Sequence, residues 1–281
     1  MNSIEVLSPV MIERMRESCR IAADTLVMIG SRIRSDITTD ELNSIVHEYT
    51  VARGGWPSSL NYHGFPKSVC TSVNEVICHG IPGPYKLRNG DIVNVDVTTY
   101  YPAKNGFHGD TSATFYVGKP SREAIHVVEV SRYCLELGIA AVRDGARVGD
   151  IGAAIQEYAE SEGCSVVRDF VGHGIGRQYH AAPQIPHFGK QDSGRRLKAG
   201  MTFTIEPMIN LGGYECDLMA DGWTVKTLDR SLSAQFEHTV LVTREGCEVL
   251  TARCQPLENS EDKPWARLGR LSSPAAFTNS T

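Results

Sequence analysis

The sequence lacks the features that mark most secreted, membrane-spanning and nucleic-acid-binding proteins. Its 281 residues contain no apolar run that could cross a membrane, and the first residues carry an acid and no apolar segment typical of a signal peptide. A net charge of −5 argues against a nucleic acid or an anionic membrane as a dedicated partner. We therefore expect a cytoplasmic protein without nucleic-acid or membrane contacts.

The eight cysteines are scattered and include no Cys-x-x-Cys pair. Thiolate zinc sites usually need such pairs, and a disulfide framework needs an oxidising compartment, so this spacing favours reduced thiols. The hydrophobic share of 41% and the charged share of 22% are those of a globular protein. A chain of this length forms one large domain or two small ones and can bury a substantial core.

Four segments have the apolar spacing of amphipathic helices. They are residues 8–33, 39–55, 121–143 and 149–163. The first begins with Ser8 and Pro9, an N-cap residue followed by a proline at the first helical position. The second ends at a glycine pair, as helices often do.

The chain is organised around an apolar strand, residues 90–98, that contains one carboxylate, Asp96. A buried Asp is rare unless it is paired or bound to a cation, because an unpaired buried charge is very costly. The same pattern of leucine, base, glycine and apolar strand returns in segment 197–206 and ends in Glu206. The two strands indicate two halves of one metal-binding core.

Other segments repeat at nearly the same offset. The fourth helix matches the second, and His63-Gly64 matches His173-Gly174. We therefore expect a single α+β catalytic domain, residues 1–251, with pseudo-twofold halves at about 8–118 and 119–251 and its site at their junction. Residues 252–281 lack periodicity and are expected to form a mostly disordered tail, in which Trp265 and Leu268 could dock.

A hairpin is expected where the first acidic strand is followed by a second, residues 111–117, just after Asp110. A tight turn at residues 105–106 would leave Asp96 and Asp110 well apart along the strands. A longer loop centred near Ala103 would place the two acids directly opposite each other. We prefer the longer loop, because two buried acids are tolerable only if they meet.

Four acids lie in apolar strand contexts: Asp96, Asp110, Glu206 and Glu237. Any one of them alone is most simply a satisfied core acid, but together they would repel one another, and no Lys or Arg lies in those strands. His173, with glycines on both sides, completes a ligand set whose charge two divalent ions would neutralise. Oxygen-rich ligation suits Mn, Fe(II), Co or Zn, and two such ions would supply hydroxide for hydrolysis near neutral pH.

Three further histidines, His63, His79 and His180, are candidates for work near the metal ions. An imidazole can donate to a developing oxyanion or hold a substrate carbonyl. The remaining histidines have no comparable glycine frame, and we expect them at the surface or supporting the ligands: His47, His108, His126, His187 and His238.

Five motifs occur in a characteristic order: NVDVT at 94–98, FHGDTS at 107–112, GHGIG at 172–176, FTIEPM at 203–208 and QFEHT at 235–239. With them the chain closely resembles the type I methionine aminopeptidases in their short bacterial form, from about Ile12 to Leu250. The resemblance implies the pita-bread fold, an antiparallel sheet covered by two helix pairs. It also implies a two-metal aminopeptidase that removes the initiator Met from new chains with a small second residue.

The resemblance assigns the ligands residue by residue: Asp96 to one ion, His173 and Glu206 to the other, and Asp110 and Glu237 to both. Glu206 would also carry the proton from the water to the leaving amine. His180 would stabilise the tetrahedral intermediate, and His79 would contact the substrate near the scissile peptide.

The resemblance also implies an apolar pocket for the Met side chain. It would be formed by Tyr62, Phe65, Cys70, Tyr179 and Trp223. The sequence departs from the family pattern at Ser59, Ala181 and Ala182, which bear on the pocket rim and on the tolerance for the second residue.

Two alternatives compete with an initiator-Met peptidase. A prolidase or proline-specific aminopeptidase resembles the same core but carries a sizeable extra N-terminal domain, whereas few residues precede the first helix here. A catalytically inactive scaffold would not need all five ligands, and all five are present. The only local indication of ribosome association is the basic segment 195–198, whose pattern favours a solvated loop before a strand.

Overall fold

The computed structural model describes residues 4–253 and Leu257. Most of the expected tail, with Trp265 and Leu268, lies outside the described residues. Leu257 is 1% exposed and belongs to the main hydrophobic core, so this part of the expected tail is packed. No helix in the described part is long and apolar enough to span a bilayer. The seven cysteines described are free thiols.

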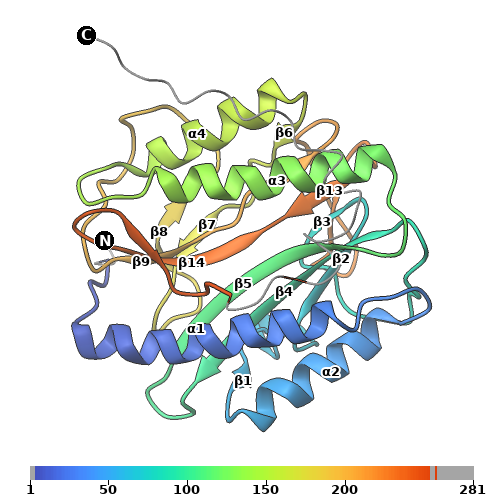
Figure 1. Ribbon diagram of the computed structural model, residues 1–281, viewed down its shortest axis with the longest axis horizontal. Coiled ribbons are helices and arrows are strands. Elements are labelled where there is room, and N and C mark those ends of the chain that lie inside the picture. Colours follow the sequence, from blue (N-terminus) through green and yellow to red (C-terminus); the bar gives the residue numbers. More distant parts are fainter. Residues whose placement is uncertain (1–3, 254–256, 258–281) are drawn as a thin grey trace.

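Four long helices lie along one side of a large sheet (Figure 1). They are α1 (Pro9–Gly30), α2 (Thr39–Ala52), α3 (Arg122–Ala140) and α4 (Val148–Ser161). All four predicted helices are therefore present, although each ends two or three residues earlier than expected. Their starts follow the sequence: Ser8 caps α1, and Thr38 forms a capping box with Glu41 at the start of α2.

The central sheet has nine strands and is antiparallel throughout. Its order is β1 (Trp56–Pro57), β4 (Ile92–Tyr101), β5 (Phe107–Tyr116), β14 (Glu237–Val242), β9 (Thr202–Ile205), β7 (Gly172–Gly174) and β8 (Ala181–Ile185), with β2 (Cys70–Val73) paired to β4 and β15 (Cys247–Val249) to β14. Segments far apart in the sequence are thus neighbours, since β5 pairs with β14 and β14 with β9.

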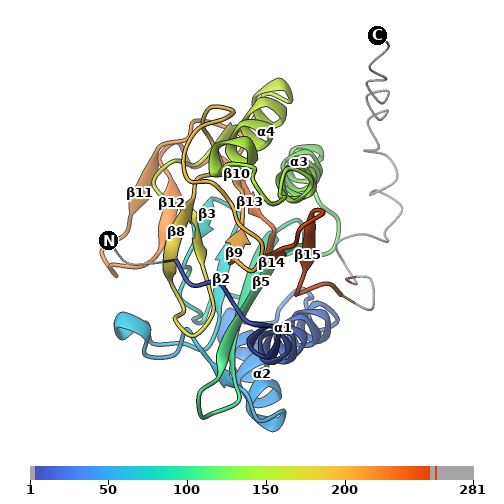
Figure 2. The ribbon, with the colours of Figure 1, turned by 90° about the vertical axis from the view of Figure 1, so that its left-hand side faces the viewer.

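Two smaller sheets and one short helix complete the described part. The first small sheet holds β13 (Ser233–Gln235), β10 (Met208–Asn210) and β6 (Ser165–Val166), and the second holds β11 (Cys216–Leu218), β12 (Val225–Thr227) and β3 (Val76–Cys78). The 3-10 helix η1 (Tyr62–Gly64) follows β1. Figure 2 shows β11 and β12 on the opposite side of the central sheet from α1 and α3.

The β4–β5 register differs from both predicted hairpins. Asp96 pairs with Ser112 and Asp110 pairs with Thr98, so the expectation that the two acids are directly opposite is wrong by two residues. The loop spans residues 102–106. Its last residue, Gly106, approaches the Pro102 carbonyl oxygen so closely that a Cβ there would lie 2.2 Å from it, so only glycine fits this position. The acids still meet, because diagonal neighbours two residues apart share one face of an antiparallel pair.

The helices and the central sheet enclose one large hydrophobic core that includes Leu26, Phe115, Val127 and Phe203. Helix α1 packs on β5 at Gly109, where a Cβ would lie 2.6 Å from the backbone nitrogen of Cys19. Glycine at this position therefore brings the helix against the strand that carries Asp110.

The helices and the acidic strands keep the offset of the sequence repeat, whereas the histidine motif does not. Helices α2 and α4 keep the same offset at their starts and at their ends, and β4 and β9 begin at the matching positions Ile92 and Thr202. His63 lies in η1 with a left-handed φ of 47°, whereas His173 lies in β7. In the second half of the chain, β7 pairs with β9, and in the first half β2 pairs with β4. The counterpart of β7 is therefore β2 and not η1, so the match of His63 with His173 is wrong.

Candidate metal centre

Five neighbouring strands each bring one predicted ligand to the same place. Asp96 lies on β4, Asp110 on β5, Glu237 on β14 and His173 on β7, and Glu206 follows the last residue of β9. These strands are consecutive in the sheet, in the order β4-β5-β14-β9-β7. The sheet therefore gathers residues that come from both halves of the chain.

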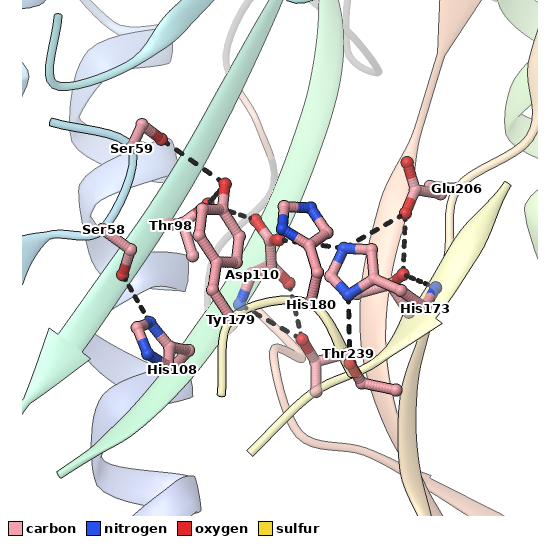
Figure 3. Close-up of polar contacts among 12 residues, drawn as sticks. Ser58, Ser59, Thr98, His108, Asp110, His173, Tyr179, His180, Glu206 and Thr239 are labelled. Carbon is pink, nitrogen blue, oxygen red and sulfur yellow. Dashed lines mark hydrogen bonds and ion pairs between the residues drawn. The ribbon is translucent and has the colours of Figure 1, made fainter. Parts of the chain in front are cut away.

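The ligand atoms converge at metal-binding distances. Asp110, His173 and Glu237 each offer one ligand atom, and these atoms lie within 4.8 Å of one another. The Nε2 atom of His173 is 3.8 Å from Asp110 Oδ2 and 3.7 Å from Glu206 Oε1 (Figure 3). Both separations are too long for hydrogen bonds, and they match two ligands on either side of one ion at about 2 Å from each.

Burial gives the carboxylates unusual proton affinities. It raises the pKa of Asp96 to about 7 and that of Glu206 to about 8. For Asp110 and Glu237, burial and then the neighbouring carboxylates raise the pKa well above its ordinary value, and Arg253 offsets only a small part of this for Glu237. The protein alone thus stabilises the four negative charges poorly, and a bound cation would stabilise them.

Two further observations fit a metal centre. The Oδ1 atom of Asp96 is buried and has no hydrogen-bond partner among the described residues. Burial also holds the pKa of His173 well below its usual range, so its imidazole is neutral and has a lone pair to offer. Oxygen ligands with one imidazole suit a divalent ion of the first transition row.

We expect the metal-free protein to lose thermal stability as the pH rises from about 6.5 to about 8. In this window Asp96 and Glu206 hold protons in the folded state that they have released in the unfolded state, so a rise in pH favours unfolding. Buried His79, His108 and His180, whose pKa is lowered to about 4, act in the opposite direction only below about 6.5. Calorimetry of chelator-treated protein measures the effect, and a melting temperature that rises across this window would contradict it.

The acid Glu206 is held from three sides. Thr204 Oγ1 donates to Glu206 Oε1 at 2.7 Å, and the Gln235 side-chain amide donates to Oε2 at 3.2 Å. The backbone N–H of Glu206 donates to Nε2 of His187 at 3.0 Å. His187 was expected either at the surface or in support of the ligands. It is 0% exposed and bonds to Glu206, so the expectation of a surface position is wrong. The sequence analysis missed Thr204 and Gln235, although both lie within the FTIEPM and QFEHT motifs.

Among the other histidines, His108 also lies near the site. Its Nδ1 is 2.8 Å from Ser58 Oγ, and its ring stacks on Tyr179 with ring centres 5.5 Å apart. The remaining three histidines form hydrogen bonds with residues other than the candidate ligands. His47 bonds to Ser68, His126 bonds to the Glu162 carbonyl, and His238 bonds to Thr251.

A cavity of about 1020 Å³ opens onto the ligands. Asp96, His173 and Glu206 line it, together with the predicted His79 and His180. His63 is not one of its lining residues but packs beside Tyr62, with ring centres 4.4 Å apart. Residues that the sequence analysis did not single out also form its wall: Glu5, Phe170, Arg177, Met208 and Gln235.

None of the five residues expected to form the Met pocket is among the lining residues of this cavity, but four of them lie next to residues that line it. Tyr62 and Tyr179 pack on His180 with ring centres 5.0 and 4.2 Å away. Phe65 and Trp223 contact each other, and Trp223 lies 6.2 Å from the ring of His79. Cys70 on β2 pairs directly with Asp96.

Residues 13–244 match the sequence pattern of metallopeptidase family M24. The chain belongs to this family. Methionine aminopeptidase A of Synechocystis sp. is 55% identical to it over 251 residues, which cover 89% of this chain and 98% of that protein. The methionine aminopeptidase of Escherichia coli K12 is 50% identical over 253 residues, which cover 89% of this chain and 95% of that protein.

Solved structures show the same fold. The crystal structure of methionine aminopeptidase from Rickettsia prowazekii matches with a TM-score of 0.87 at 47% identity, covering 89% of this M24 chain and 100% of that one. Prolidase from Pyrococcus horikoshii matches in fold alone, with a TM-score of 0.71 at 18% identity over 65% of its length. The expected pita-bread fold and the resemblance to type I methionine aminopeptidases are confirmed. So is the expectation of a metallopeptidase that binds divalent metal.

Proposed function

We propose that this M24 protein is a methionine aminopeptidase that removes the initiator Met from nascent chains with a small second residue. The observation that carries the proposal is the convergence of five candidate ligands from five neighbouring strands, three of which, Asp96, His173 and Glu206, line one cavity. Relatives of this name match the chain at 50–55% identity over nearly their whole length.

We further propose two divalent ions, Mn, Fe(II), Co or Zn, as the cofactors. Asp96 would hold one ion, His173 and Glu206 the other, and Asp110 and Glu237 would bridge them. When bound, such a pair supplies an activated water as the nucleophile and polarises the scissile carbonyl. Four carboxylates whose burial disfavours charge, with one neutral imidazole, support this assignment.

The remaining steps fall to side chains at the cavity. Glu206 lines the cavity, and its carboxylate would take a proton from the attacking water and pass it to the leaving amine. His180 is neutral, and its Nδ1 lies 2.8 Å from the Tyr62 hydroxyl. When Tyr62 donates to Nδ1, the ring proton sits on Nε2 and can stabilise the oxyanion. His79 lines the same cavity and would contact the substrate next to the scissile bond.

The Met side chain would be bound by the aromatic residues and Cys70 around the cavity. Such an apolar slot distinguishes Met from Leu by only about 1–3 kcal/mol for a misplaced methyl group. New chains made in the cytoplasm are the substrates that this reaction implies. Transient ribosome association would use residues 195–198, where Leu197 is buried and three basic residues are exposed.

A peptide series tests the proposal. With manganese bound, we expect release of Met from Met-Ala-Ser at least about tenfold faster than release of Leu from Leu-Ala-Ser, because the branched side chain fits the slot poorly. Formyl-Met-Ala-Ser is the matched control and should be inert, since its amino group is blocked. Preferred cleavage of Xaa-Pro peptides would favour a prolidase instead, and no cleavage despite bound metal would favour an inactive scaffold.

A further inference from the structure

Three hydroxyl groups form a hydrogen-bonded chain that ends on the carboxylate of Asp110 (Figure 3). Thr98 Oγ1 donates to Asp110 Oδ1 at 2.6 Å. The Tyr179 hydroxyl lies 2.7 Å from the same Thr98 oxygen, and Ser59 Oγ lies 3.5 Å beyond it. Thr98 and Asp110 are 1% and 3% exposed and face each other across the β4–β5 pair. Water therefore does not replace these contacts.

The direction of the chain follows from its proton inventory. A threonine hydroxyl has one proton, and the Asp110 carboxylate can only accept when it is ionised. Thr98 therefore gives its proton to Asp110 and must accept from Tyr179. Burial keeps the Tyr179 hydroxyl protonated, since its pKa is raised well above the ordinary value. Tyr179 donates to Thr98, and Thr98 donates to Asp110.

We propose that Thr98, backed by the Tyr179 hydroxyl, is a positioning residue that holds the Asp110 carboxylate in its ligand orientation and so sets metal affinity. The proposal rests on the proposed metallopeptidase function. Thr98 occupies one lone pair of Oδ1, while Oδ2 is the oxygen 3.8 Å from His173 Nε2. A hydroxyl that accepts one hydrogen bond donates a stronger one. The hydrogen bond from Tyr179 therefore strengthens the bond that Thr98 donates to Asp110. Tyr179 thus has a polar role beyond the apolar pocket expected from the sequence.

The test is calorimetric titration of metal-free protein with manganese(II) chloride. Thr98→Val removes the donor without changing the shape, and we expect it to weaken the affinity for at least one ion by about 10–100-fold, as loss of partners around metal ligands commonly does. Thr98→Ser keeps the hydroxyl and should restore affinity close to that of the unaltered protein. Tyr179→Phe leaves Thr98 in place and should weaken binding roughly tenfold or less.

Two controls separate this role from general disturbance of the sheet. Thr227→Val removes a buried hydroxyl of β12, one that donates to the Ser231 carbonyl rather than to a ligand carboxylate. Tyr62→Phe removes a hydroxyl that contacts His180 instead. Both should retain the manganese affinity of the unaltered protein.

The inference is overturned if Thr98→Val binds manganese normally, if Thr98→Ser fails to restore binding, or if Thr227→Val weakens it equally. It also fails if the unaltered protein binds no manganese. Release of Met from Met-Ala-Ser, measured on the same samples, reports on the proposed function separately. A protein that binds manganese with the expected ranking of variants but releases no Met would contradict the function and leave this role of Thr98 standing.

Discussion

Replacing Asp96 with asparagine is expected to remove at least one divalent ion and most of the release of Met. The Oδ1 atom of Asp96 is buried without a hydrogen-bond partner in the described part of the chain, so a cation is the contact it lacks. A neutral amide is a weaker ligand and leaves the charge of the site unbalanced. The loss should exceed the roughly 10–100-fold that removal of an outer partner costs. Metal content by mass spectrometry and kcat on Met-Ala-Ser measure it.

Asp91→Asn is the matched control for Asp96→Asn. Asp91 is also a buried acid, 8% exposed, but it accepts hydrogen bonds from the Tyr85 hydroxyl, the Arg88 N–H and the Asn74 amide. Its replacement should lower stability and leave the metal content unchanged. Normal metal content and normal kcat in Asp96→Asn would refute the role of Asp96 as a ligand.

His180→Ala is expected to keep the metal ions and lower kcat by about 10²–10³-fold, which is the usual effect of removing one oxyanion donor. The His180 ring lies at the mouth of the ligand set, 4.0 Å from the ring of His173, and is oriented by Tyr62 rather than by a carboxylate. Because a transition-state contact is lost, KM should change little. Steady-state kinetics at saturating manganese separate the two parameters.

The control for His180→Ala is His126→Ala, since His126 bonds to the Glu162 carbonyl away from the cavity. That variant should retain both kcat and metal content. An unchanged kcat in His180→Ala would disprove the oxyanion role. Loss of metal from the same variant would instead make His180 a ligand.

The sequence predicted the elements that local patterns specify. Helices with a cap and a long apolar stripe, such as α1 after Ser8-Pro9, were predicted to within a few residues at their starts. Four acids in apolar strands without nearby basic residues predicted a cluster of candidate ligands, because a bound cation makes that pattern tolerable. The spacing did not specify the hairpin register, since Asp96 and Asp110 share a face whether they are opposite or diagonal.

Contacts across the fold were beyond the reach of the sequence. His187 and Thr98 look like ordinary polar residues there, and only the sheet order brings them to Glu206 and Asp110. Tyr179 was expected as an apolar wall, whereas its hydroxyl bonds to Thr98. The match between His63 and His173 failed for the same reason, because a constant offset does not ensure equal pairing of strands.

The most direct test is a titration of metal-free protein with manganese in which bound ions and free Met released from Met-Ala-Ser are measured together. We expect no release without metal, and release that rises with bound manganese to a plateau at two ions per chain. Full release by the metal-free protein, or none with two ions bound, would contradict a dinuclear methionine aminopeptidase.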